Sequence, residues 1–262
     1  MIELTDNLTK SVIKLAEEAG RAILQIYAGP INVTVKGDSS PLTQADQLAH
    51  SILTAGLSTL TPQLPVISEE SSAEEQARRP ELACYWLIDP LDGTKEFIQR
   101  NGEFTVNIAL IEQGVSRFGV VHVPVSGNTY WGGAGIGAWR KDGTGEQAIK
   151  VVKPAAGEPL TVVGSRSHLN TETENFLSSL GPYELVSVGS SLKFCLLAEG
   201  KAHIYPRLAP TCEWDTAAAQ AVLEGAGGSV CALDGSPLRY SKPEILNPWF
   251  VARSVQADEL SA

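Results

Sequence analysis

The sequence contains few of the residues that cross-link secreted proteins or bind zinc. Its 262 residues include four cysteines and four histidines. No two cysteines stand in C-x-x-C spacing and no paired Cys/His motif occurs, so the sequence indicates neither a disulfide framework nor a zinc site. Cys84 and Cys195 lie in apolar runs and are expected to be buried thiols. The expected compartment is therefore a reducing cytoplasm.

Two further absences limit the possible functions. The sequence has no recognisable signal peptide and no apolar run long enough to span a bilayer, although peripheral contact with the cytoplasmic face of a membrane stays open. Basic residues are also scarce: 20 Lys and Arg stand against 30 Asp and Glu, a formal net charge of −10. This balance argues against binding to a nucleic-acid polymer. An anionic small-molecule substrate would need metal ions or a local group of Lys and Arg.

The residues that are present predict a globular chain, because 43% of them are hydrophobic and 19% are charged. The order of the predicted elements indicates a mixed α/β class. Apolar residues at steps of three and four predict an amphipathic helix from about Leu4 to Tyr27, with Asp6 as its cap. Thr43 is expected to cap a second helix. Strand-like segments separated by glycines and prolines predict an antiparallel meander from Phe104 to Arg140.

The second half of the chain alternates short strands and helices, which is the α/β pattern. Two polar segments fall between the predicted elements. The segment 71–81 is acidic and then basic, and it is expected to be an exposed loop. The segment 141–158 is expected to link the two halves.

The stretch from Trp86 to Phe97 is the strongest candidate for chemistry. An apolar strand ends in Asp89 and Asp92, and two carboxylates this close repel each other unless a cation or proton lies between them. Gly93 allows the backbone to approach a ligand, and Thr94 adds a hydroxyl. Oxygen-only ligands favour Mg²⁺ or Ca²⁺ over zinc. Taken alone, the same residues are equally consistent with two consecutive turns.

Other carboxylates strengthen the metal interpretation. Glu69 follows a second short apolar strand, so both strand ends could contribute to one cation site. Asp46 lies in the first turn of the second helix, where it could also serve only the helix dipole. Asp215 opens a later helix and could be only a cap.

Three polar loops are candidates for contact with a ligand. The segment Gly164–His168 follows a strand, where ligand contacts collect in α/β folds. The segment Gly189–Lys193 opens a helix, an arrangement that binds anions, although Ser190 could serve simply as the helix cap. The loop with Lys36 could be a flap over a site or only a solvated loop.

In combination, these motifs resemble those of a known family. The Ser-Glu-Glu, Asp-Pro-Leu-Asp-Gly-Thr-x-x-Phe and Trp-Asp motifs occur here in the order typical of the inositol monophosphatase-like, Mg²⁺-dependent, lithium-sensitive phosphatases. The resemblance extends from the Ser-Pro-Leu-Thr-x-x-Asp segment near residue 40 to Gly227-Gly228. Asp-Gly-Thr-Lys-Glu-Phe, Gly-Ser-Arg-Ser-His and Gly-Ser-Ser-Leu-Lys-Phe-Cys are similar to the 3′(2′),5′-bisphosphate nucleotidase branch.

The resemblance implies a layered α-β-α-β-α sandwich acting as a single catalytic unit over residues 1–262. Its halves would be an α+β part with an antiparallel sheet (1–145) and an α/β part (155–262). It also implies hydrolysis of adenosine 3′,5′-bisphosphate to AMP and phosphate with two or three Mg²⁺ ions, a role in sulfur metabolism, and a monomer or homodimer.

The resemblance also implies a role for each site residue. Four carboxylates and one backbone carbonyl would bind the metal ions, and a hydroxyl and a carboxylate would orient the attacking water. The remaining residues would contact the nucleotide. Glu69 counts among the catalytic residues, and Glu69, Leu91, Asp92, Thr94 and Asp215 would also contact substrate. The metal ligands would be Glu69, Asp89, the Leu91 carbonyl, Asp92 and Asp215; the water-orienting pair Asp46 and Thr94; and the substrate contacts Gly93, His168, Ser190, Lys193 and Arg207. Glu213, beside Trp214-Asp215, receives no role.

Three alternatives stay open at this point. A relative with the same metal site could act on inositol monophosphate or fructose 1,6-bisphosphate. A catalytically idle module could bind nucleotide and Mg²⁺ to regulate a partner. A purely structural explanation would treat every strand-end and helix-start acid as a cap or turn.

Overall fold

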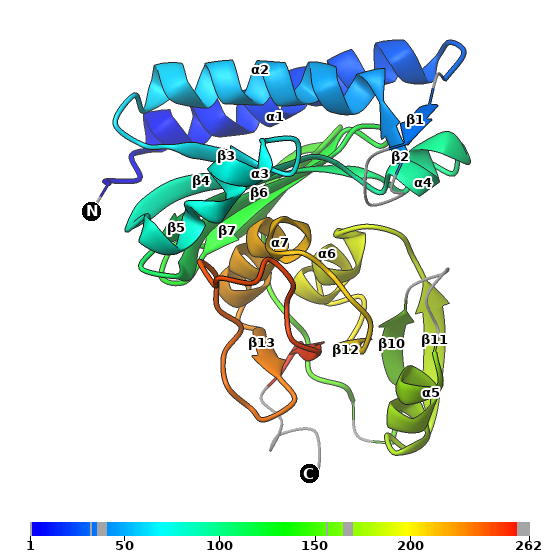
Figure 1. The fold of residues 1–262 in the computed structure, drawn as a ribbon. Helices are drawn as coiled ribbons and strands as arrows, with labels where there is room; N and C mark the ends of the chain where they lie inside the picture. Colours follow the sequence, from blue (N-terminus) through cyan, green and yellow to red (C-terminus); the bar gives the residue numbers. More distant parts are fainter. Residues whose placement is uncertain (1, 32, 36–40, 156, 165–169, 256–262) are drawn as a thin grey trace.

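Helices and sheets alternate in five layers in a computed structural model of the chain (Figure 1). The structure describes residues 2–31, 33–35, 41–155, 157–164 and 170–255. From one side to the other, the layers are two long helices, a seven-stranded sheet, two central helices, a five-stranded sheet and one outer helix. This arrangement confirms the predicted α-β-α-β-α sandwich. No helix in the described part of the chain is long and apolar enough to cross a membrane.

The first layer consists of α1 (Asp6–Tyr27) and α2 (Gln44–Leu60). The apolar stripe of α1 is buried against α2 and the first sheet, as its periodicity predicts. Its cap is Thr5, whose hydroxyl accepts a hydrogen bond from Leu8 N (3.2 Å), so the assignment to Asp6 was wrong by one residue. Thr43 caps α2 as predicted.

The seven-stranded sheet places two acid-bearing strands side by side. Strand β3 is parallel to β4, with Ser68 opposite Ile88, so both strands deliver their following residues to the same edge. The next five strands form an antiparallel meander, as predicted. The expected link at 141–158 was partly wrong, because its first residues complete β8 and form β9. The strands in spatial order are β3 (Val66–Ser68), β4 (Cys84–Asp92), β5 (Thr105–Glu112), β6 (Val115–Val123), β7 (Asn128–Gly133), β8 (Gly137–Asp142) and β9 (Gly145–Ile149).

The connection between β3 and β4 is more ordered than its charge pattern predicted. It is largely exposed, as predicted, but it contains helix α3 (Ala73–Ala77), capped by Ser72, and a 3₁₀ turn at Arg79–Glu81. Arg79 is buried at 2% exposure, which a run of mixed charges does not suggest. The expectation for the thiols was also half right: Cys195 is buried, whereas Cys84, at the start of β4, is only partly buried.

The central layer consists of α6 (Leu192–Ala198) and α7 (Glu213–Gly225), lying between the two sheets (Figure 1). Small residues let α7 lie close to the first sheet: a Cβ added to Gly119 in β6 would stand 2.0 Å from the Ala218 carbonyl oxygen. The core around these helices draws residues from both halves of the chain, including Tyr85, Phe194 and Phe250. The start of α7 is thereby held beneath the end of β4.

The second sheet follows the order β11-β10-β12-β14-β13 and carries helix α5 on its outer face. Strand β14 was not predicted. A separate two-stranded ribbon and the short helix α4 lie beside the end of β4. The remaining elements are β1 (Val33–Val35), β2 (Pro41–Thr43), α4 (Thr94–Ile98), β10 (Leu160–Gly164), α5 (Thr171–Ser178), β11 (Tyr183–Ser187), β12 (Ile204–Arg207), β13 (Ser229–Ala232) and β14 (Phe250–Arg253).

Candidate active site

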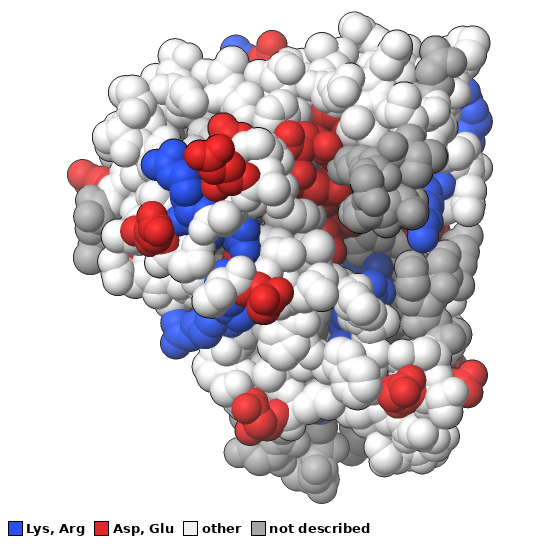
Figure 2. Space-filling view, viewed as in Figure 1, with Lys and Arg blue, Asp and Glu red and all other residues white. Residues whose placement is uncertain are grey.

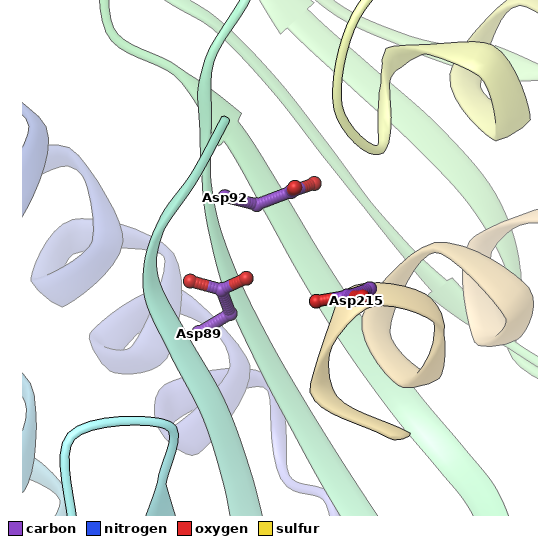
Figure 3. Close-up of side chains that lie close together, drawn as sticks. All are labelled: Asp89, Asp92 and Asp215. Carbon is purple, nitrogen blue, oxygen red and sulfur yellow. The ribbon is translucent and has the colours of Figure 1, made fainter. Parts of the chain in front are cut away.

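Three aspartates converge where β4 ends and α7 begins (Figure 3). One carboxylate oxygen from each of Asp89, Asp92 and Asp215 lies within 4.8 Å of the other two. In a regular strand, residues three positions apart point to opposite faces. The pairing of β4 with β5 contains a bulge, however, because Asp89 lies opposite Asn107 and Asp92 opposite Thr105. The additional residue turns both carboxylates toward α7.

Glu69 approaches the same cluster from β3. Its N–H donates to the Ile88 carbonyl oxygen (3.1 Å), which continues the parallel pairing beyond the strand and brings its side chain into hydrogen-bonding range of Asp89. The four acids predicted from strand ends and a helix start are therefore neighbours. The Leu91 carbonyl belongs to the same turn, 3.3 Å from Thr94 Oγ1.

The electrostatics of this cluster fit a divalent cation. Burial, reinforced most strongly among the neighbouring charges by Glu69, raises the pKa of Asp89 well above its ordinary range. Burial and the charge of Asp92 raise the pKa of Asp215 to about 8. Ionised carboxylates at such positions are costly unless a positive charge neutralises them. An all-oxygen set of carboxylates and one carbonyl suits Mg²⁺ better than zinc.

Ser191 holds Asp92 and the start of α7 together. Asp92 Oδ2 accepts hydrogen bonds from Ser191 N (2.6 Å) and lies 2.8 Å from Ser191 Oγ, which is 2.9 Å from the Asp215 carbonyl oxygen. The expectation that Ser190 caps α6 was wrong, because Ser191 occupies the N-cap position and makes no side-chain cap. Ser190 instead adopts a left-handed φ of 47° and lies 3.1 Å from Thr105 Oγ1.

A hydroxyl and a carboxylate lie next to the acid cluster. Thr94 Oγ1 is 3.2 Å from Asp46 Oδ1. Asp46 is buried, and its other oxygen accepts hydrogen bonds from Thr43 N (2.7 Å) and Thr43 Oγ1 (2.6 Å). The same carboxylate thus caps α2 and faces Thr94, so the two interpretations of Asp46 are compatible. Gly93, with a φ of 94°, makes the turn that brings Thr94 here.

Basic side chains lie beside the acids in one pocket. Figure 2 shows acidic side chains gathered near the middle of this face, with Lys and Arg side chains below them. Lys193 is buried, and its ammonium donates to the carbonyl oxygens of Ser190 (2.6 Å) and Val188 (3.2 Å). Burial lowers the pKa of Lys193 to about 8. The pocket is lined by Asp92, Gly93, Glu96, Gly189, Ser190, Lys193, Phe194, Tyr205, Arg207, Thr211, Asp215 and Thr216.

Two predicted site residues, His168 and the flap residue Lys36, lie outside the described residues. The sequence interpretation also missed residues that support the acids. Besides Ser191, the side chains of Thr105 and Asn107 reach to 3.4 Å of Asp92 Oδ2. A signal for these two was present: they are polar residues at alternate positions of an otherwise apolar strand, and so share one face.

Comparisons with known proteins show the family of the chain. Residues 4–258 match the model of the inositol monophosphatase family. The chain is 49% identical to the 3′(2′),5′-bisphosphate nucleotidase CysQ of Escherichia coli K12 over 242 residues, which cover 91% of this chain and 96% of that protein. The Haemophilus influenzae protein of the same name is 35% identical over 255 residues, covering 96% and 94%.

Solved structures show the same relationship. The crystal structure of CysQ from Bacteroides thetaiotaomicron, described as a bacterial member of the inositol monophosphatase family, has a TM-score of 0.83 and 41% identity, covering 95% of this chain and 97% of that one. An IMPase from Thermotoga maritima shares the fold with a TM-score of 0.79 at 23% identity, covering 95% and 92%. The fold, the match over residues 4–258 and these identities show that the chain belongs to the inositol monophosphatase family.

Proposed function

We propose that this protein is a Mg²⁺-dependent phosphatase that removes the 3′-phosphate of adenosine 3′,5′-bisphosphate, leaving AMP and phosphate. The observation that carries the proposal is the acid cluster beside a pocket with two cations, Lys193 and Arg207. The 49% identity to a 3′(2′),5′-bisphosphate nucleotidase supports the choice of substrate. Because β4 and α7 both contribute acids, the halves 1–145 and 155–262 would work as one catalytic unit.

In this proposal the carboxylates of Glu69, Asp89, Asp92 and Asp215, with the Leu91 carbonyl, hold two or three Mg²⁺ ions. When bound, Mg²⁺ supplies Lewis-acid stabilisation of the phosphate and lowers the pKa of water. Ser191 donates hydrogen bonds to Asp92 Oδ2, which leaves the other carboxylate oxygen of Asp92 for the metal ions. Gly93 and Ser190 line the pocket where the 3′-phosphate would lie.

Thr94 and Asp46 would orient the attacking water. A hydroxyl that donates its hydrogen to Asp46 keeps its lone pairs available, so Thr94 Oγ1 can accept a hydrogen bond from water. If water gives its proton to Thr94, the hydroxyl proton of Thr94 passes to Asp46. Thr43 N and Oγ1 fix the Asp46 carboxylate on its other side, which holds the hydroxyl in this orientation. The pair therefore acts by positioning a proton rather than by forming a covalent bond to phosphorus.

Lys193 and Arg207 would bind the 5′-phosphate of the nucleotide. Two of the three ammonium protons of Lys193 point at loop carbonyls, which leaves a third for a ligand. Arg207 donates to the carbonyl oxygens of Ala209 (3.2 Å) and Pro210 (2.7 Å) and retains further donors in the pocket. His168, outside the described residues, remains part of the proposed nucleotide site.

The direct test is phosphate release with Mg²⁺ from adenosine 3′,5′-bisphosphate, inositol 1-phosphate and fructose 1,6-bisphosphate at equal concentrations. We expect a clear preference for the nucleotide. A preference for inositol 1-phosphate or fructose 1,6-bisphosphate would be compatible with the metal site but would contradict the proposed substrate. Nucleotide binding without any phosphate release would favour the regulatory module.

Arg207→Ala should discriminate between substrates with and without a 5′-phosphate. We expect kcat/KM for adenosine 3′,5′-bisphosphate to fall about 10- to 100-fold, since a hydrogen bond to a charged group contributes about 1.5–3 kcal/mol. Turnover of adenosine 3′-phosphate, which lacks that group, should change little. Arg117→Ala, on the exposed side of β6 beside Glu112, is the control. Equal losses on both nucleotides would remove this role from Arg207.

Ser191→Ala should weaken metal binding. The substitution removes a hydroxyl that lies between the Asp92 carboxylate and the Asp215 backbone carbonyl, so the carboxylate of Asp92 and the first turn of α7 gain freedom. We expect the Mg²⁺ concentration for half-maximal activity to rise about tenfold. Loss of a group that orients metal ligands typically weakens metal affinity about 10- to 100-fold, and this is the lower limit of that range. Ser178→Ala, on the outer face of α5, is the matched control. An unchanged Mg²⁺ requirement would show that backbone contacts alone hold Asp92.

A further inference from the structure

A buried ion pair joins the two halves of the chain close to the acid cluster, because one of its members is the first residue of α7. Arg79 Nε donates to Glu213 Oε2 at 3.2 Å, and the two side chains are 3% and 0% exposed. The residues are 134 positions apart in sequence. A charged pair in such a position is costly to desolvate, and removing Arg79 would leave the buried Glu213 carboxylate to Lys242 Nζ, a second cation 2.6 Å away.

Glu213 fixes the first turn of α7. Besides Arg79, its carboxylate accepts hydrogen bonds from Ser241 N (3.2 Å), Lys242 N (3.0 Å) and Lys242 Nζ (2.6 Å). Its own N–H donates to the Ile245 carbonyl oxygen (3.0 Å). Glu213 is the first residue of α7, and the metal-site residue Asp215 follows two positions later. The orientation of Asp215 therefore depends on how Glu213 is held.

Arg79 connects at its other end to the segment that carries Glu69. Its Nη1 donates to the Gln76 carbonyl oxygen. The Gln76 side-chain amide in turn lies 2.8 Å from the Glu69 carbonyl oxygen and 3.2 Å from that of Ser68. A continuous set of contacts thus runs from the backbone of Glu69, through Gln76, Arg79 and Glu213, to the turn that presents Asp215.

We propose that Arg79 and Glu213 are positioning residues that hold the Glu69 segment and the start of α7 at the spacing that the metal ions require. This inference rests on the proposed metal-ligand roles of Glu69 and Asp215. Neither side chain of the pair is among those lining the active-site pocket, so the pair would act through the ligands rather than on substrate. Its removal should therefore appear in the Mg²⁺ dependence before it appears in substrate affinity.

The test compares Arg79→Met and Glu213→Gln with a matched ion-pair variant elsewhere. The control is Glu199→Gln, because Glu199 follows α6, pairs with Arg140 in β8 at 3.1 Å, and also joins the halves, but lies outside the pocket. Two quantities are measured for each protein: the rise in Tm when Mg²⁺ replaces EDTA, and the Mg²⁺ concentration that gives half-maximal release of phosphate from adenosine 3′,5′-bisphosphate.

For both site variants we expect the half-maximal Mg²⁺ concentration to rise about 10- to 100-fold and the Mg²⁺-induced Tm rise to shrink, with kcat at saturating Mg²⁺ largely retained. Glu199→Gln should lower Tm in EDTA but leave both Mg²⁺ readouts at the wild-type values. Arg79→Lys keeps the positive charge but lacks the planar guanidinium with its several N–H donors. It should therefore bind Mg²⁺ more tightly than Arg79→Met but less tightly than the wild-type protein. Glu213→Gln keeps the shape of the side chain and one of its two acceptor oxygens, so it is the milder variant and serves as the second test should Arg79→Met fail to fold.

A site variant that loses Tm in EDTA while keeping the wild-type Mg²⁺ dependence would overturn the inference and make the pair purely structural. A different result would contradict the proposed function, namely that the wild-type protein releases no phosphate from the nucleotide. In that case the Mg²⁺-induced rise in Tm would still show whether the Arg79–Glu213 pair supports metal binding.

Discussion

Asp89→Asn should reduce Mg²⁺-dependent phosphate release about a thousandfold, because a ligated metal contributes several kcal/mol to the transition state and about 1.4 kcal/mol corresponds to a factor of ten. Asp89 is buried at 1% exposure between Glu69, Asp92 and Asp215, so no other side chain can take its place. The measurement is turnover of adenosine 3′,5′-bisphosphate over a range of Mg²⁺ concentrations. Near-normal turnover in the purified variant would overturn the metal site.

The same substitution should make the metal-free protein more stable. Burial and neighbouring charges raise the pKa of Asp89 in the folded protein. Its contribution to the stability of the fold is therefore full below the ordinary carboxyl pKa and is lost as the pH rises through the raised pKa. A neutral Asn removes this penalty at neutral pH. We expect Tm in EDTA to rise by about 3 °C or more, since 1 kcal/mol corresponds to about 2–4 °C in a chain of this size. Asp234→Asn, at an exposed turn, is the control and should not raise Tm.

Thr94→Ala should lower kcat about 100- to 1000-fold, within the range of about 10²–10⁴ for loss of a proton-transfer group, with the Mg²⁺ requirement changed little. Thr94 Oγ1 lies 3.2 Å from Asp46 Oδ1, so its loss removes the group that would accept the hydrogen bond of the attacking water and relay a proton to Asp46, while the carboxylates stay in place. Thr94→Ser keeps the hydroxyl and should retain most activity. Weakened Mg²⁺ affinity as the main effect would remove Thr94 from the water-orienting role and make its contact with the Leu91 carbonyl the important one.

The acids could be predicted from sequence because their signal is local. Carboxylates that directly follow apolar strands are conspicuous, and parallel neighbours such as β3 and β4 bring their following residues to one edge. The layered fold followed from the helical periodicity, the meander and the later alternation, together with the family resemblance. Asp215 was predictable only through the motif, since a helix-start acid is ordinarily a cap.

The features that were missed depend on partners far away in the chain. The mixed charges around Arg79 indicate a solvated loop, and only Glu213 explains why this arginine is buried. Between Ser190 and Ser191, the sequence alone does not show which side chain faces Asp92, because a left-handed backbone at Ser190 decides it. Strand β14 pairs with β12 and β13 by contacts that no local pattern predicts.

The bulge in β4 has a second consequence, which concerns backbone oxygens. Pro90 and Leu91 together face the single residue Val106, so one peptide unit of β4 falls out of step with the hydrogen-bonding ladder. Pro90 has no N–H to leave unpaired, and Leu91 N donates to Asp89 Oδ1 at 3.0 Å. The donors of this irregularity are thus accounted for, and its extra peptide unit adds a carbonyl, that of Leu91, which lies 3.3 Å from Thr94 Oγ1. A shorter Asp-x-Asp strand would also place two carboxylates on one face, but without the extra residue it would offer one backbone oxygen fewer to the proposed cation site.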